Sequence, residues 1–112
     1  MRIRNFPREV WRDSVSSGNL AKTISFSHPV IVWEIRVHLS AAPAALETFT
    51  ATMDAAAGAA YDAVVASQDM SGLTNKRFEG PIHLDEDDDL DLAMVNSLNR
   101  TIGVEVWYEE LR

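Results

Sequence analysis

Residues 30–40 read VIVWEIRVHLS, and this stretch decides the fold class. Its residues alternate between an apolar set and a more polar set. Alternation with a period of two over ten residues is typical of a β-strand with one buried and one solvent-exposed face. The pattern predicts an antiparallel sheet. We expect the odd-numbered residues Ile31, Trp33, Ile35, Val37 and Leu39 to be buried. Glu34, Arg36 and His38 are expected to be more exposed.

Shorter alternating stretches on both sides of this segment predict further strands. Their residues are mostly β-branched or large apolar, and glycine, proline, asparagine or aspartate interrupts them. Residues 67–80 carry several such interrupting residues and are expected to form a loop. The expected strands are residues 20–26, 81–84, 90–94 and 102–109.

Residues 41–66 are ambiguous, because their apolar residues also fit a helical stripe and alanine favours helices. Thr48, Thr50 and Thr52 alternate with apolar residues, and β-branched residues favour strands. We therefore expect strands at 47–54 and 60–67, joined by a turn around 55–59.

About seven short strands in 112 residues predict one all-β domain, an antiparallel β-sandwich or jelly roll. We expect this domain to span residues 20–112. Residues 1–19 are expected to form an extended N-terminal arm, because Pro7 interrupts a helix and a Ser/Gly/Asn-rich loop follows. The arm has too few apolar residues for a core of its own.

The charge is distributed unevenly. Residues 1–40 hold six basic and three acidic residues, whereas residues 41–112 hold four basic and fourteen acidic residues. A basic beginning on an acidic body suggests a docking arm or head-to-tail contact between copies, although an acidic solvated surface explains the body equally well. The arm residues expected at a protein interface are Arg2, Arg4, Phe6, Arg8, Trp11 and Arg12.

Composition excludes several function classes. The net charge of −7 argues against direct nucleic-acid binding, which needs concentrated lysine and arginine. The absence of cysteine excludes disulfides, thiolate metal sites and cysteine nucleophiles. No apolar run is long enough to span a membrane, and the first residues lack the apolar stretch of a signal peptide. We therefore expect a protein that is made and used in a cytoplasm, or one that another component carries out of the cell.

The sequence contains no recognisable catalytic motif, and we expect neither enzymatic activity nor a cofactor. His28, His38 and His83 are isolated from one another in sequence. The acidic run Asp85–Asp89 with Asp91 offers the oxygen ligands that calcium prefers, but Leu90 stands where an EF-hand loop requires glycine. A solvated turn without a metal is the preferred interpretation.

Three tryptophans are the remaining informative residues. Trp33 belongs to the apolar set of its strand and is expected in the core. Trp107 alternates with Val104 and Val106, so it is either core or an exposed interaction residue, and the core is favoured. With Asp85–Asp91, Trp107 could also form a carbohydrate-binding cleft.

The order of elements between residues 30 and 108 resembles small β-sandwich virion proteins of tailed bacteriophages, of the structural, decoration or fibre type. The resemblance rests on the strand at 32–40, on TFTAT at 48–52, on YDAVV at 61–65 with SQDMS at 67–71, on PIHL at 81–84, and on LDL at 90–92 followed by GVEV at 103–106.

This resemblance implies a non-enzymatic virion protein, most simply a capsid decoration or cement protein present in many copies. Its partners would be the major capsid protein or other virion proteins, with homo-oligomers in the assembly. The particle would form in the host cytoplasm. The alternative is a receptor- or carbohydrate-binding β-module of a tail or head fibre.

Overall fold

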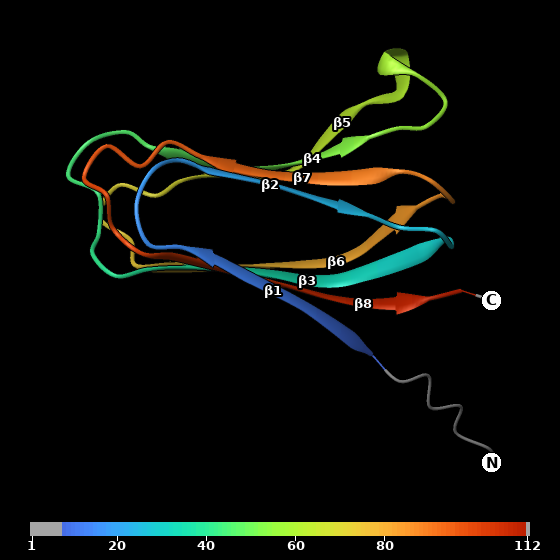
Figure 1. Ribbon diagram of the computed structural model, residues 1–112, viewed down its shortest axis with the longest axis horizontal. Helices are drawn as coiled ribbons and strands as arrows, with labels where there is room; N and C mark the ends of the chain where they lie inside the picture. Colours follow the sequence, from blue (N-terminus) through green and yellow to red (C-terminus); the bar gives the residue numbers. More distant parts are fainter. Residues whose placement is uncertain (1–7, 112) are drawn as a thin grey trace.

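The computed structural model describes residues 8–111, which fold into two antiparallel β-sheets packed face to face (Figure 1). Within these residues a short 3-10 helix, η1 (Ala59–Tyr61), connects two of the strands. The expected all-β sandwich is therefore confirmed. The strands are β1 (Glu9–Val15), β2 (Leu20–Ser25), β3 (Val30–Leu39), β4 (Thr48–Asp54), β5 (Ala63–Asp69), β6 (Asn75–Leu84), β7 (Asp89–Met94) and β8 (Ile102–Glu110).

The strand order identifies the sandwich as a jelly roll. The first sheet has the order β1-β8-β3-β6, and the second has the order β2-β7-β4-β5. The antiparallel pairs β1–β8, β2–β7, β3–β6 and β4–β5 thus join strands that are equally far from the middle of the chain. A long hairpin rolled into two sheets has this arrangement.

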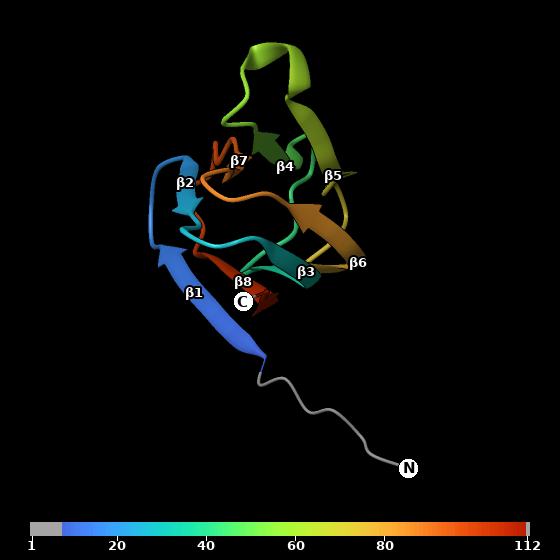
Figure 2. The same cartoon turned by 90° about the vertical axis from the view of Figure 1, so that its right-hand side faces the viewer.

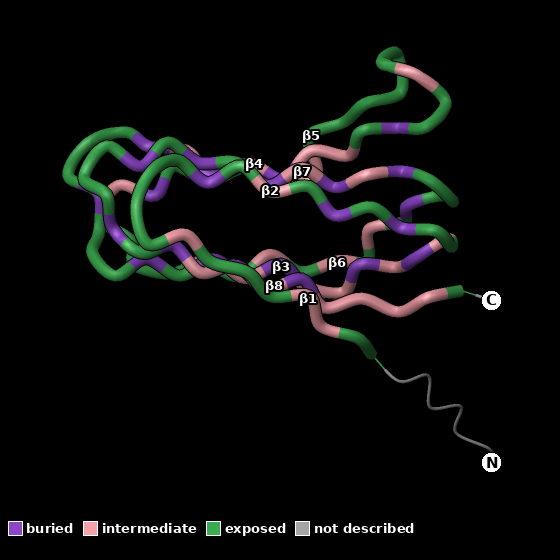
Figure 3. Tube along the Cα trace, viewed as in Figure 1, coloured by how far each residue is buried: buried purple, intermediate pink, exposed green. Residues whose placement is uncertain are grey.

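The hydrophobic core lies between the two sheets. Inward residues of most strands are buried, and those of β1 are partly buried. The buried residues appear as purple segments in both layers in Figure 3. Apolar burial of this kind is the main favourable contribution to folding. The largest fully buried side chains are Phe49, Leu20, Ile35, Leu39, Met70, Leu84, Leu90, Leu92 and Ile102.

The expected alternation along residues 31–39 is correct only in its second half. Ile35, Val37 and Leu39 are buried, whereas Ile31 and Trp33 are only partly buried, and Val30 and Val32 occupy the core instead. The cause is a β-bulge. Val32 lies opposite Tyr108 and Glu34 lies opposite Trp107, so Trp33 is an extra residue in β3. One extra residue exchanges the two faces of a strand.

Gly80 accommodates this bulge from the neighbouring strand β6. In the β3–β6 ladder Val32 pairs with Ile82 and Glu34 pairs with Glu79, so Gly80 and Pro81 lie beside the bulge. A Cβ atom at Gly80 would overlap the carbonyl oxygen of Val32. A side chain is therefore excluded here by the close approach of two backbones.

The described part of the expected N-terminal arm is an edge strand of the sandwich, not an arm. Residues 9–15 pair along their whole length with β8. The reason is that Trp11 and Val15 pack against the core, and Lys22 of β2 lies 3.0 Å from the Asp13 carboxylate. Arg2, Arg4 and Phe6 lie outside the described residues.

Two other expectations change in the middle of the chain. The expected loop at 67–80 contains the end of β5 and the first half of β6, a ten-residue strand. The ambiguous region 41–66 forms strands, as preferred, but the connection between β4 and β5 is longer than expected and includes η1. Figure 2 shows this connection projecting from the body of the sandwich.

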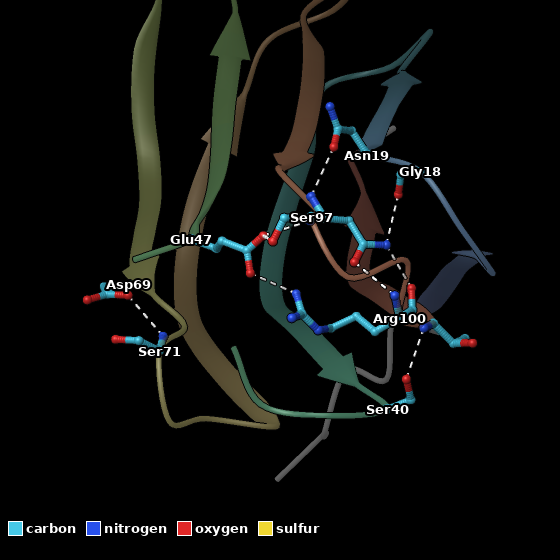
Figure 4. A network of polar contacts seen from close by, with 10 residues as sticks. Gly18, Asn19, Ser40, Glu47, Asp69, Ser71, Ser97 and Arg100 are labelled. Atoms are coloured by element: carbon cyan, nitrogen blue, oxygen red, sulfur yellow. Dashed lines mark hydrogen bonds and ion pairs between the residues drawn. The ribbon is translucent and has the colours of Figure 1, made fainter. Parts of the chain in front are cut away.

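The loops at one end of the sandwich are joined by a buried ion pair (Figure 4). Arg100 Nη1 lies 2.8 Å from Glu47 Oε2, and only 2% and 8% of the two side chains are exposed. Glu47 also accepts hydrogen bonds from the backbone N–H and the hydroxyl of Ser97, both at 2.8 Å. These contacts fix the β3–β4 loop to the β7–β8 loop.

Asn96 extends this network to the β1–β2 turn. Its side-chain amide donates to the carbonyl oxygens of Gly18 and Arg100, and its backbone N–H donates to the side-chain oxygen of Asn19. Nε and Nη2 of Arg100 are buried and have no partner within residues 8–111. The ion pair is therefore held by a shell of short polar contacts at the end of the core.

The acidic run forms a turn, as expected, but one of its carboxylates is structural. Asp88 is buried. Its side-chain oxygens accept hydrogen bonds from the backbone N–H groups of Ala56 at 2.9 Å and Asp85 at 2.8 Å. Asp88 thus shapes the β6–β7 turn and connects it to the β4–β5 connection.

We expect Gly80→Ala to destabilise the protein by about 1–3 kcal/mol, because the added methyl group overlaps the Val32 backbone. Gly103→Ala is the matched control, since a Cβ at Gly103 meets no atom within 4 Å. Urea unfolding of both variants measures the difference. Equal stability of the two variants would contradict the close approach at the bulge.

We expect Glu47→Gln to destabilise the protein by about 3 kcal/mol, because it leaves the buried Arg100 without a counter-charge. The Ser97 backbone N–H, the Ser97 hydroxyl and the Arg100 guanidinium lower the pKa of Glu47, against the effect of burial. The stabilisation from Glu47 is therefore complete above its unfolded pKa of about 4.3 and is lost as the pH falls through the lower folded value.

Urea unfolding between pH 6 and pH 2 tests this dependence. The variant should lose less stability than the wild type over this range, whereas exposed Glu86→Gln should behave like the wild type. Parallel curves for wild type and Glu47→Gln would show that the ion pair does not contribute.

Candidate functional site

The outer face of the first sheet carries the most distinctive set of exposed side chains. The ladders place its residues in rows that cross all four strands. We call it the tryptophan–arginine face. Its successive rows are Val10–Trp107–Glu34–Glu79, Arg12–Glu105–Arg36–Arg77 and Ser14–Gly103–His38–Asn75.

Two tryptophans of this face lie beneath arginine side chains. The Arg36 guanidinium carbon is 4.9 Å from the centre of the Trp107 ring, and that of Arg12 is 5.7 Å away. Arg8 lies 5.0 Å from the Trp33 ring. Cation–π contacts of this kind hold the rings and the guanidinium groups together at the surface.

Carboxylates on the same face pair with the arginines. Arg36 Nε and Arg77 Nε lie 3.0 Å and 2.8 Å from Glu34 Oε1, and Glu105 pairs with Arg12 and lies 3.9 Å from Arg36 Nη1. The hydrogen bond from Arg36 lowers the pKa of Glu34, and the same contact raises the pKa of Arg36. Both groups therefore stay charged over the physiological pH range.

A hollow of about 520 Å³ lies at the row of Gly103. Gly103 has no side chain, and the neighbours across the ladders are Ser14 and His38. Arg12 and Arg36 border the hollow from the adjacent row. A smaller hollow of about 270 Å³ lies between Arg8, Trp33, Glu34, Arg77, Glu79 and Gly80.

The outer face of the second sheet differs in composition. Half of the residues that line a hollow on that side are alanine or threonine: Ala21, Thr48, Thr50 and Ala93. At one end Asp54 lies opposite Asp89 in the ladder. The nearby Asp62 carboxylate, with burial and the neighbouring aspartates, raises the pKa of Asp54. This face has no aromatic–arginine cluster among the described residues.

The six residues expected at an interface fall into three groups: on the tryptophan–arginine face, against the core, and outside the described residues. Arg8 and Arg12 lie on the tryptophan–arginine face. Trp11 does not, because it lies opposite the buried Val106 and packs against the core. The remaining three residues lie outside the described part.

Sequence reasoning missed most of this face. Trp33 and Trp107 were expected in the core but are only partly buried. They lie on the tryptophan–arginine face together with Arg36 and Arg77. The signal for Trp107 was present, since it alternates with buried Val104 and Val106. The position of Trp33 depends on the β-bulge, and the residue pattern does not predict that bulge.

The other sequence-based site hypotheses do not assemble. Trp107 lies on the outer face of the first sheet and Asp89 and Asp91 lie on the outer face of the second, so they form no common carbohydrate cleft. Within residues 8–111 no three histidine, aspartate or glutamate side chains are grouped so that they could hold a metal.

Comparisons with known proteins add little. No protein-family model matches the chain, and no curated protein matches it. Among solved structures the chain is similar to "Structure of infectious bursal disease virus Gx strain", at 10% sequence identity and a TM-score of 0.39. The match covers 94% of this chain and 37% of that chain. A likeness this weak carries no argument about function. No helix in the described part of the chain is long and apolar enough to cross a membrane.

We expect Trp33→Ala to cost only about 1 kcal/mol, because the ring is partly buried at the surface and not in the core. Phe49→Ala, at a fully buried position, should cost about 3–5 kcal/mol. Urea unfolding of both variants measures the two losses. If Trp33→Ala lost as much stability as Phe49→Ala, the ring of Trp33 would have to be a core side chain, contrary to its position here.

Proposed function

We propose that this protein is a non-enzymatic virion structural protein that docks on other chains of a particle through the tryptophan–arginine face. A capsid decoration or cement protein is the most specific form of this proposal. The partners would be the major capsid protein or other virion proteins, together with further copies of this chain. The particle would be assembled in the host cytoplasm.

The observation that carries the proposal is the clustering of two tryptophans and four arginines on one sheet face. Tryptophan and arginine are enriched among the residues that dominate protein–protein binding energy. The rings are fixed by Arg8, Arg12 and Arg36, so little side-chain freedom remains to be lost on docking. The opposite sheet offers no comparable anchors among the described residues.

The fold agrees with this role but does not decide it. Jelly rolls occur in viral capsid domains and also in lectin domains. The resemblance to phage virion proteins favours the capsid role. Arg2, Arg4 and Phe6 precede Arg8 in the chain, and we propose them as further interface residues on that basis.

A carbohydrate-binding module of a fibre is the second candidate. It is favoured by aromatic rings and carboxylates on the same face, as in the hydrogen bond of 3.1 Å from Trp33 Nε1 to Glu109. A sugar would have to stack on a free ring face, however, and Arg36 lies over Trp107. The arginine contacts therefore favour protein docking.

The proposal predicts that the protein attaches to purified particles that lack it, and that Trp33→Ala with Trp107→Ala weakens attachment by about 2 kcal/mol or more. Thr50→Ala on the other outer face is the matched control and should attach like the wild type. Co-sedimentation with particles, at equal loading of folded protein, gives the affinities. Full attachment of the double variant, or selective binding of an oligosaccharide in a glycan array, would overturn the proposal.

A further inference from the structure

One end of the sandwich exposes no charged side chain. Four loops meet there and are called the loop end: residues 16–19, 40–47, 70–74 and 95–101 (Figure 1). Their only charged residues are Glu47 and Arg100. Both are buried and paired with each other, so the loop end presents an uncharged surface to the solvent.

The loop end also exposes large apolar side chains. Leu46 is 72% exposed and Leu98 is 68% exposed, and Leu73 and Val95 are exposed as well. A hollow of about 360 Å³ that Val95 and Thr48 help to line continues this surface onto the outer face of the second sheet, and none of its lining residues is charged. Grouped apolar side chains at a surface are typical of protein contacts.

The loops at this end are fixed by their own contacts. Leu46 and Leu98 are the chain neighbours of Glu47 and Ser97, which are joined by two hydrogen bonds of 2.8 Å (Figure 4). Backbone hydrogen bonds of 2.9 Å also join the β3–β4 loop to the β5–β6 loop. A partner that covers the two leucines therefore has little loop motion to arrest.

The charge distribution selects a second copy of this chain as that partner. The loops at the other end of the sandwich, residues 26–29, 55–62 and 85–88, hold five acidic residues and no lysine or arginine. Copies of a chain with a net charge of −7 repel each other. The repulsion is smallest when the two uncharged ends meet, because each acidic end is then a strand length, about 20 Å or more, from the contact.

Other arrangements are less favourable. In a head-to-tail contact the acidic loops of one copy would be desolvated against an uncharged surface that offers them no cation. An anionic lipid surface attracts lysine and arginine, and the loop end exposes neither.

We propose that the loop end is a contact surface between two copies of this chain, which meet end to end through Leu46, Leu98 and Val95. This surface is distinct from the tryptophan–arginine face. The inference goes beyond the proposed function, because it assigns a second contact surface and needs no particle.

Sedimentation equilibrium of the purified protein, from micromolar to millimolar concentration, tests the inference. We expect a monomer–dimer equilibrium that Leu46→Ser with Leu98→Ser weakens at least about tenfold. Both side chains are exposed, so urea unfolding should show nearly unchanged stability. Tyr61→Ser is the matched control, because Tyr61 is 65% exposed at the opposite end, and it should dimerise like the wild type.

Two further measurements report on the geometry of the dimer. Added sodium chloride should strengthen self-association, because ions screen the repulsion between acidic chains, whereas it would weaken a contact made by ion pairs. The chain has no cysteine, so Ser17→Cys and Glu86→Cys each accept one spin label. Labels at position 17 in the loop end should lie closer together in the dimer than labels at position 86 in the acidic end.

Several results would overturn the inference. They are a wild type that stays monomeric, a leucine double variant that dimerises like the wild type, a dimer that salt weakens, and labels at position 86 that lie as close as those at position 17. A monomeric wild type that binds particles or uncharged vesicles through Leu46 and Leu98 would also overturn it, because another partner then covers the loop end.

Particle attachment separates this inference from the proposed function. If the double tryptophan variant dimerises but no longer attaches to particles, both proposals are supported. If it dimerises and still attaches, the docking face is wrong and the loop-end contact stands. If it no longer dimerises while the leucine double variant does, the copies meet through the tryptophan–arginine face and the loop-end contact is wrong.

Discussion

The bulge at Trp33 is the constraint on which the first sheet depends. One extra residue in β3 exchanges the two faces of the strand, so Val30 and Val32 enter the core and Trp33 leaves it. Gly80 makes the bulge possible, because the Val32 carbonyl occupies the space of its missing side chain. The same local event therefore completes the core and places an aromatic ring on the surface, where Arg8 covers it. Bulges are frequent beside functional sites for this reason.

The second constraint lies at the loop end of the sandwich. A buried ion pair costs desolvation energy and seldom stabilises more than an apolar pair of the same size. Glu47 and Arg100 are held by hydrogen bonds from Ser97 and Asn96, which connect the β3–β4, β7–β8 and β1–β2 loops. The network thus fixes the positions of three loops with respect to each other.

The residue pattern predicted the fold class and most of the strands, because alternation reports directly on which face of a strand is buried. It failed where a local irregularity changes the register. Residues 30–33 (VIVW) are all apolar, so their pattern does not show which of them are buried. The bulge places Val30 and Val32 in the core instead of Ile31 and Trp33. It also failed for residues 9–15, whose charged residues suggested an arm, because an edge strand exposes one face and carries charge to avoid pairing with other chains. The tryptophan–arginine face needs four strands in register, and no single stretch of sequence contains that information.

The tryptophan–arginine face also shows how an acidic protein can hold several arginines close together on one sheet. Arg36 and Arg77 lie directly opposite each other in the ladder, which is unfavourable for like charges. Glu34 lies between them and contacts both, so the repulsion is offset within the chain. Arginines that are already paired and stacked on tryptophan lose less hydration and less side-chain freedom when a partner covers them. In the proposed docking, the charges would define which partner fits, while the aromatic rings would supply most of the affinity.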